Sequence, residues 1–274
     1  ALWINPNYTN QMYLGTDGGV YISMDRGATW IFASNLPVGQ FYHVAVDNQQ
    51  PYRIYGGLQD NGSWVAPSAA PGGVQNGDWK AIYGGDGFWT IPDPLDPDIA
   101  YAEYQGGNMG RVNLKTLKSV TIKPQAGSND AKLRWNWNTP IHIGQNNPKN
   151  LYCGAQFLFK STDKGTNWTR ISPDLTTNDK KKQEQENSGG LSADNTSAEN
   201  HTTIFAIAES PLDENLIWVG TDDGNLQYTT DGGKNWTNVS ANIAAAGIPS
   251  QTWVSSVEPG RFNRNVIYAT FDNH

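Results

Sequence analysis

Hydrophobic residues fall in short runs along the chain, and polar turns, many of them with a proline, separate these runs. One kind of run recurs, in which apolar residues surround an aromatic residue and small residues follow, as at residues 12–15 and 54–57. The recurring aromatic residues are Tyr13, Tyr55, Tyr101, Tyr152, Trp218 and Tyr268. Short apolar runs bounded by turn residues are typical of β-strands, whereas helices need longer periodic segments. The pattern therefore predicts an all-β chain.

The predicted strands form repeated units. A polar turn precedes most of the recurring aromatic strands, and another apolar run precedes each turn, as at residues 44–46 and 141–143. Each unit is strand, proline turn, strand, polar loop, strand, Asp-bearing turn and strand. The recurring aromatic residues are 42, 46, 51, 66 and 50 residues apart. Four short strands in each such interval are typical of a β-propeller blade, so we expect five complete blades and part of a sixth.

The Asp-bearing turn follows a fixed pattern, Ser/Thr-x-Asp-x-Gly-x-x-Trp, which occurs at residues 23–30, 161–168 and 229–236. The Asp side chain can accept hydrogen bonds from backbone N–H groups that follow it, and the Gly can adopt a positive φ. The Trp begins the next strand and can pack on a neighbouring sheet. We therefore expect structural roles for Ser23, Asp25, Gly27, Trp30, Ser161, Asp163, Gly165, Trp168, Thr229, Asp231, Gly233 and Trp236.

We expect residues 1–274 to form a single propeller, with a polar insertion at about 176–201 that accounts for the longest interval. A propeller closes on itself to remove sheet edges. Five and a half blades do not close in this pattern. The expectation is therefore that the propeller is incomplete, and that the rest of a larger protein supplies the remaining blades or a second propeller.

Composition excludes several classes of protein. The formal net charge is −7, and the only basic run is residues 180–182, so no nucleic-acid partner is expected. No apolar stretch reaches the roughly 18 residues that a membrane span needs. The single Cys153 gives neither a disulfide framework nor a cysteine-based zinc site. No metal or other cofactor is expected; acidic turns such as residues 222–224 could hold calcium, but no complete ligand loop is present.

The Asp-bearing pattern resembles the Asp-box, or BNR, repeat of sialidases, sortilin-type ectodomains and xyloglucan-cleaving glycoside hydrolases. Longer phrases at residues 1–6, 56–62, 84–88, 172–176 and 217–224 resemble large secreted bacterial proteins with sortilin-like BNR propellers, which are often described as glycosyl hydrolases. The resemblance covers nearly the whole chain. It implies Asp-box hairpins in the blades and an extracellular or periplasmic location. Because Asp boxes are structural and their hosts have unrelated functions, it implies less about activity.

In a propeller of this kind, two sets of loops surround the mouth of the central channel on the face away from the Asp-bearing turns. Lead-in loops precede the first strand of each blade, and hairpin loops join the second and third strands. Both sets are rich in aromatic, amide and carboxylate side chains, which suit the C–H faces and hydroxyl edges of sugar rings. The expected ligand-binding residues are Gln40, Gln59, Asn61, Trp89, Gln105, Arg134, Trp135 and Trp137. The alternative, that these aromatic residues pack between blades and the amides cap turns, stays open for each residue.

Glycoside hydrolysis requires two carboxyl groups a defined distance apart. The candidates are Asp60 and Asp86, on adjacent units at the expected mouth. Residues 84–88 are similar to the stretch around the catalytic acid of xyloglucan-cleaving enzymes, although the intervening residues differ. Asp17 resembles those enzymes' other catalytic position, but its surroundings recur at Asp222, which favours a turn role.

The sequence thus predicts a secreted propeller that binds a polysaccharide or glycan at the channel mouth and, if it is an enzyme, hydrolyses it with paired carboxylates. A sialidase is disfavoured, because an arginine cluster is missing: only Arg111 and Arg134 fall near the expected mouth. The alternative is a non-catalytic, sortilin-like propeller that binds a protein or peptide.

Overall fold

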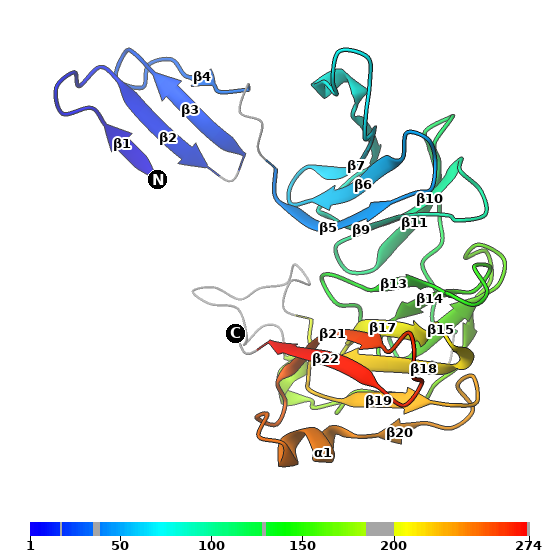
Figure 1. Ribbon diagram of the computed structural model, residues 1–274. Helices are drawn as coiled ribbons and strands as arrows, with labels where there is room; N and C mark the ends of the chain where they lie inside the picture. Colours follow the sequence, from blue (N-terminus) through cyan, green and yellow to red (C-terminus); the bar gives the residue numbers. More distant parts are fainter. Residues whose placement is uncertain (17, 35–38, 128–129, 185–199, 273–274) are drawn as a thin grey trace. The chain divides into compact units, whose positions relative to one another are not determined.

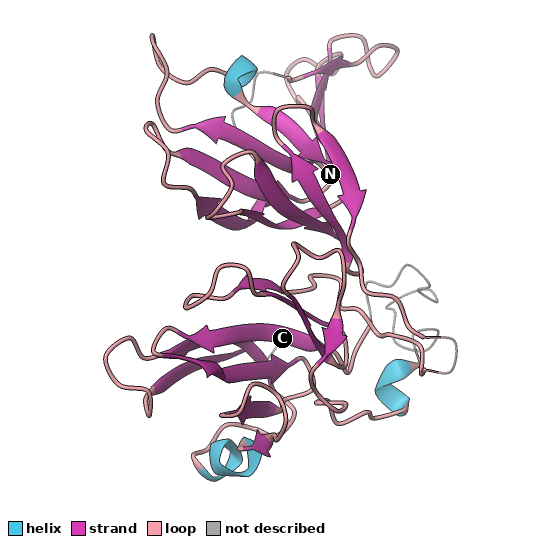
Figure 2. Cartoon of the chain, turned by 90° about the vertical axis from the view of Figure 1, so that its right-hand side faces the viewer, coloured by secondary structure: helices cyan, strands magenta, loops and turns pink. Residues whose placement is uncertain are grey.

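A computed structural model of the chain describes residues 1–16, 18–34, 39–127, 130–184 and 200–272 (Figure 1). Strands dominate these residues (Figure 2). The helical segments in this described part are α1 (Ser240–Ala245) and two 3-10 turns, η1 (Asn76–Asp78) and η2 (Lys181–Gln183). The prediction of an all-β chain is confirmed.

The chain divides into two compact units, Ala1–Gln40 and Phe41–His274. The first unit holds one four-stranded antiparallel sheet, with β1 (Leu2–Ile4), β2 (Met12–Thr16), β3 (Gly19–Ser23) and β4 (Ile31–Phe32) paired in chain order. Each strand therefore pairs with the next one along the chain, as the repeated pattern predicts.

The second unit holds the other sheets, and here too the strands of each sheet follow chain order. The first two four-stranded sheets contain β5 (Phe41–Val46), β6 (Arg53–Leu58), β7 (Gly62–Pro67) and β8 (Lys80–Tyr83), then β9 (Gly87–Pro92), β10 (Ile99–Tyr104), β11 (Asn108–Asn113) and β12 (Lys118–Thr121). The next two contain β13 (Ile141–Ile143), β14 (Leu151–Gly154), β15 (Leu158–Ser161) and β16 (Thr169–Arg170), then β17 (Ile204–Ser210), β18 (Asp213–Thr221), β19 (Leu226–Thr229) and β20 (Thr237–Asn238). A two-stranded sheet follows, made of β21 (Trp253–Pro259) and β22 (Ile267–Asp272).

The hydrophobic core of the second unit lies between consecutive sheets. The first cluster joins Tyr55 of β6 to Ala102 of β10, and the second joins Met109 of β11 to Leu151 of β14. The third joins Leu158 of β15 to residues of β17 and β18, and the fourth joins β17 to Val254 of β21. Each sheet thus packs on the next along the chain, as propeller blades do.

Two of the recurring tyrosines, Tyr55 and Tyr101, link the second strand of a sheet to a carboxylate in the preceding turn. The Tyr55 hydroxyl donates to Asp47 Oδ2 at 3.1 Å, and the Tyr101 hydroxyl donates to Asp93 Oδ2 at 2.9 Å. Asp47 and Asp93 each precede the strand that carries the tyrosine, so the bond closes the proline turn. In these two units, the aromatic residue and its turn therefore recur together because a hydrogen bond joins them.

The three Asp-bearing turns have matching hydrogen bonds. The side chains of Asp25, Asp163 and Asp231 accept from the backbone N–H four residues later, at 2.8, 2.8 and 2.9 Å. The first Ser or Thr of each pattern donates to the same carboxylate and accepts from the Gly N–H, as Ser23 does with Gly27 and Thr229 does with Gly233. Likewise, the Ser161 hydroxyl donates to Asp163 and accepts from the Gly165 N–H. The three glycines have φ of 86°, 80° and 102°, a region that disfavours other residues.

The tryptophans of two turns reach back to the preceding sheet. The Trp168 indole N–H donates to the carbonyl oxygen of Ile122 at 2.6 Å, and that of Trp236 donates to Ile171 at 3.2 Å. Trp30 lies in the first unit, where its ring packs on Gly27 of its own turn. Hydrogen bonds from Asn167 lower the pKa of Asp163 to about 2, so its carboxylate stays charged in the turn.

The expected insertion is only partly described. Residues 176–184 and 200–201 belong to the described part, and Thr177 donates to Asp223 through both its backbone N–H and its hydroxyl at 2.7 Å. The remainder of the insertion and Asp17 lie outside the described residues.

Candidate carbohydrate-binding surface

Lead-in and hairpin loops of consecutive sheets contact one another in the second unit. The backbone N–H of Asp60, in a hairpin loop, donates to Asp86 Oδ1 of the next lead-in loop at 2.6 Å. At the next junction the N–H of Gly106 donates to the carbonyl oxygen of Trp137 at 3.1 Å. The two sets of loops that the sequence places around a mouth therefore meet at these junctions.

Asp86 holds two hairpin loops together. Its Oδ2 accepts from the Gln105 amide at 3.1 Å, and its backbone N–H donates to Gln105 Oε1 at 2.7 Å. Its other oxygen accepts the N–H of Asp60. Both carboxylate oxygens of Asp86 are therefore engaged with the protein.

The backbone geometry on either side of Asp86 explains why residues 84–88 are rich in glycine. Gly85 has a φ of 73°, and its carbonyl oxygen accepts from the N–H of Gly62 at 2.9 Å. A Cβ added to Gly87 would overlap the carbonyl oxygen of Gly62. Because two backbones approach this closely, the position accepts no side chain.

Asp60 differs from Asp86 in its surroundings. Asp60 is exposed and has a φ of 59°, a left-handed conformation that Asp tolerates better than most residues. The predicted ligand-binding residues Gln59 and Asn61 flank it, and the Asn61 amide donates to the Gln59 carbonyl oxygen at 3.0 Å. Asp60 is therefore accessible to solvent in this loop.

Tyr42 lies beside Asp60 and Asp86, although no motif in the sequence singles it out. Its ring lies 4.3 Å from that of the buried Phe88, which in turn meets the Trp137 ring edge-on at 6.2 Å. Burial raises the pKa of Tyr42, and the nearby carboxylates of Asp86 and Asp60 raise it further, while a hydrogen bond with the Trp137 side chain opposes them. The hydroxyl is therefore protonated at neutral pH and acts as a hydrogen-bond donor, not as a nucleophile.

Trp89 lies beside this group. Its ring stacks on that of His43, with centroids 3.9 Å apart and planes 17° apart. His43 hydrogen-bonds the Asn138 side chain at 3.1 Å, and burial lowers the pKa of this histidine. The imidazole is thus neutral at pH 7. The predicted stacking ring of Trp89 has one face covered by His43.

The structure places the other predicted ligand-binding residues differently. Arg134 donates to the Thr202 carbonyl oxygen at 3.0 Å and to Asp174 at 2.8 Å, so it ties the lead-in loop to residues on both sides of the insertion. Trp135 is 6% exposed and packs in the core cluster of β11 and β14. Gln40 is the last residue of the first unit and is exposed. The Tyr42 surface, defined as Tyr42, Asp60, Asp86, Gln105 and Trp137, includes none of these three residues.

A second group of titratable residues lies farther along the loops. Asp222 is fully buried, accepts the N–H of Thr203 at 2.9 Å and the Asn136 amide at 3.1 Å, and also hydrogen-bonds the Thr203 hydroxyl. Burial raises the pKa of Asp222 to about 7. His201 Nδ1 lies 3.6 Å from Asp222, and His201 Nε2 accepts from the Trp253 indole at 3.2 Å.

The sequence suggests only a turn for this region, because the spacing of residues 201, 222 and 253 carries no motif. Within the described residues, no group of three or more His, Cys, Asp or Glu side chains is arranged to hold a metal ion. Across the same residues, no helix has both the length and the apolar character that crossing a membrane requires.

Comparisons with known proteins point to the fold. No family model matches the chain, and no curated protein matches it. Among solved structures, a GH74 enzyme from Niastella koreensis aligns with a TM-score of 0.57 at 17% identity. The alignment covers 98% of this chain and 43% of the enzyme's chain. An ancestral GH74 enzyme aligns with a TM-score of 0.53 at 18% identity, and the alignment covers 94% of this chain and 33% of that enzyme's chain. GH74 enzymes are β-propeller glycoside hydrolases, and this chain spans less than half the length of either one. The likeness shows that the chain has a propeller-like, all-β fold of the kind found in these enzymes.

Proposed function

We propose that the chain binds a polysaccharide with the Tyr42 surface. The observation that carries the proposal is that Tyr42, at the start of β5, meets Asp60, Asp86 and Trp137 of neighbouring hairpin and lead-in loops, in a fold found in GH74 glycoside hydrolases. Loops at one end of a rigid β-scaffold are common sites of ligand binding.

The side chains of this surface complement a sugar. The Trp137 ring can pack on the C–H face of a pyranose, and the protonated Tyr42 hydroxyl can donate to a ring or hydroxyl oxygen. The exposed Asp60 carboxylate can accept from sugar hydroxyls. Asp86 and Gln105 keep the loops in place through their mutual hydrogen bonds.

Binding is better supported than hydrolysis by this pair of carboxylates. A glycosidase needs one carboxyl group as acid and another as nucleophile or base. Both oxygens of Asp86 already accept hydrogen bonds from the chain, so we assign Asp86 a positioning role. Asp60 is assigned the contact with ligand because it is exposed. A hydrolytic site would therefore need a further carboxyl group.

The proposal extends to the architecture. The five four-stranded sheets and the two-stranded sheet are taken as blades of one propeller over residues 1–274, with the turns at Asp25, Asp163 and Asp231 as Asp boxes. The matching hydrogen bonds of the three turns and the packing of consecutive sheets support this assignment. An extracellular or periplasmic location is proposed with it, from the resemblance to secreted proteins.

The experiment that tests this function is binding of the protein to a broad panel of soluble polysaccharides, with release of reducing ends followed on the same samples. Binding without release is expected. Release that is lost in an Asp60→Asn variant would show that hydrolysis takes place here. Silence on every glycan, with capture of a peptide or protein instead, would contradict the proposal and favour a sortilin-like role.

A further inference from the structure

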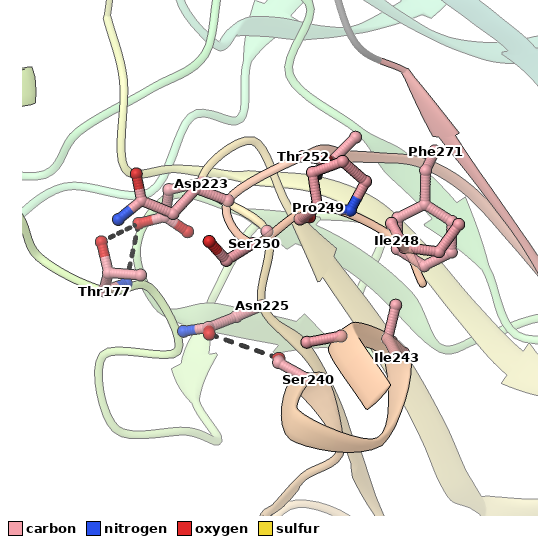
Figure 3. Close-up of a pocket in the computed structure, with 13 residues that line it drawn as sticks. Thr177, Asp223, Asn225, Ser240, Ile243, Ile248, Pro249, Ser250, Thr252 and Phe271 are labelled. Carbon is pink, nitrogen blue, oxygen red and sulfur yellow. Dashed lines mark hydrogen bonds between the residues drawn. The ribbon is translucent and has the colours of Figure 1, made fainter. Parts of the chain in front are cut away.

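A cavity lies at another junction between a hairpin loop and a lead-in loop. Its volume is about 150 Å³, and it is bounded by the hairpin loop after β18, by α1 and by the lead-in loop before β21 (Figure 3). Every residue that lines it belongs to the second unit. It shares no residue with the Tyr42 surface.

The position of this cavity corresponds to that of the Tyr42 surface. At the junction of β6–β7 with β9, the hairpin loop meets the lead-in loop where Asp60 contacts Asp86. At the junction of β18–β19 with β21, the hairpin residue Gly224 meets the lead-in residue Gln251, and a Cβ on Gly224 would lie 2.5 Å from the Gln251 Cα. In the second case the chain between the two sheets includes α1, which forms one wall of the cavity.

The cavity has one polar and one apolar side. Figure 3 shows Asp223, Asn225 and Ser250 on one side and Ile243, Ile248 and Phe271 on the other. Ser250 and Gln251 both belong to the lining, and no hydrogen bond from the other described residues reaches the Ser250 hydroxyl or the Gln251 side-chain amide. These two groups are therefore available to a ligand.

The charge of the lining indicates a neutral ligand. Among the described residues that line the cavity, Asp223 alone has an ionisable side chain, and it is 1% exposed. Its Oδ2 accepts from Thr177 at 2.7 Å and its Oδ1 accepts from the Thr221 hydroxyl at 2.5 Å. The protein's own donors therefore already satisfy both oxygens of this side chain, and a neutral ligand can occupy the cavity without breaking these hydrogen bonds.

The size of the cavity limits the ligand to one ring. Pockets for drug-sized molecules usually measure about 300–1,000 Å³, well above this volume. An apolar wall opposite hydroxyl and amide groups matches the C–H face and the hydroxyl edge of a sugar. We propose that this cavity binds one neutral pyranose ring, at a second carbohydrate site separate from the Tyr42 surface. The choice of a sugar rests on the proposed function, whereas the site itself does not.

The test is titration with methyl β-D-glucopyranoside, methyl β-D-xylopyranoside and methyl β-D-galactopyranoside, followed by ligand-observed NMR. At least one is expected to bind with a dissociation constant in the millimolar range, as a ligand of a single ring should. An Ala244→Phe substitution fills the cavity from α1 and should weaken binding by at least about tenfold, because the ring and the new side chain cannot both fit. Ser250→Ala should weaken it by about three- to tenfold through the loss of one hydrogen bond.

The matched control is Ala241→Phe, which places the same side chain at an exposed position of α1 outside the cavity lining and should leave binding unchanged. If no neutral glycoside binds the wild-type protein, or if Ala244→Phe binds as well as Ala241→Phe, the inference is overturned. Binding of glucosamine alone would also overturn it, since that would show selection of a cation. A Trp137→Ala variant separates the two proposals, because it should weaken polysaccharide binding at the Tyr42 surface by about tenfold or more and leave monosaccharide binding in the cavity unchanged.

Discussion

Asp60 and Asp86 are both loop aspartates followed by a glycine within two residues, yet their environments separate their roles. Asp86 has both oxygens bonded to neighbouring loops, whereas Asp60 is exposed in a left-handed conformation. The same contrast separates the predicted tryptophans, because Trp135 is in the core and Trp137 meets Tyr42 and Phe88. Adjacent positions on an irregular loop can point in opposite directions. Sequence alone therefore predicts the loop that carries a site better than the side chains that reach it.

The glycines around Asp86 give a direct test of the loop geometry. Gly87→Ala is expected to lower the free energy of unfolding by about 1–3 kcal/mol or more, because its methyl group would overlap the Gly62 backbone. Urea denaturation measures the change. Gly84→Ala is the matched control, since a Cβ there meets no atom within 4 Å. Equal stability of the two variants would show that the close approach of these loops is wrong.

The buried Asp222 predicts a pH dependence of stability. Its pKa of about 7 lies above the ordinary value of 3.8, so burial destabilises the charged form of the folded protein. The cost is absent below about pH 4, grows as the pH rises toward 7 and is constant above that. Asp222→Asn removes this titration. The stability of the variant relative to wild type should therefore increase between pH 4 and pH 7, as measured by urea denaturation.

His201 titrates near Asp222, so both chains in this comparison carry His201→Gln. A stability difference that stays constant from pH 4 to pH 8 would contradict the burial of an ionisable Asp222.

At the scale of single elements, the turns follow the sequence closely. The turn of the Asp-bearing pattern is local, because the side-chain hydrogen bonds of its Ser or Thr and its Asp join residues no more than four apart, so a short motif can specify it. The tyrosine bonds to Asp47 and Asp93 are nearly as local. Tyr152 breaks this rule, because its hydroxyl donates at 2.9 Å to Glu209, on β17 of the next sheet. That partner lies 57 residues away, and no motif in the sequence predicts it.

The Tyr152–Glu209 bond should contribute to holding two sheets together. Both side chains are fully buried, and Glu209 also accepts from Asn146 at 2.8 Å. Tyr152→Phe is expected to lower the free energy of unfolding by about 1–3 kcal/mol, because a buried oxygen of Glu209 loses its hydrogen-bond donor. Thermal and urea denaturation measure it.

Tyr268→Phe serves as the control for this substitution, because Tyr268 is 68% exposed and its loss of a hydroxyl should change stability by less than about 0.5 kcal/mol. A Tyr152→Phe variant as stable as Tyr268→Phe would mean that the bond between the sheets does not form.

At the scale of the whole molecule, the repeat predicts most of the architecture. The order of strands, their antiparallel pairing and the packing of consecutive sheets all follow from a unit that recurs along the chain. The repeat does not predict the division of the chain into residues 1–40 and 41–274. The interval between the recurring aromatic residues Tyr13 and Tyr55 is similar to the later intervals. The cavity beside α1 was also beyond sequence reasoning, since it depends on how a single linker departs from the repeat.

The measurement that tests the central claim most directly is the affinity of wild type and Trp137→Ala for the best polysaccharide of the panel, by isothermal titration calorimetry. Trp3→Ala is the control, because Trp3 is 51% exposed and belongs to the first unit, away from these loops in sequence. Loss of an aromatic platform should weaken binding by about tenfold or more for Trp137→Ala and leave it unchanged for Trp3→Ala. Equal affinity of wild type and Trp137→Ala would contradict a carbohydrate-binding surface at Tyr42, Asp60, Asp86, Gln105 and Trp137.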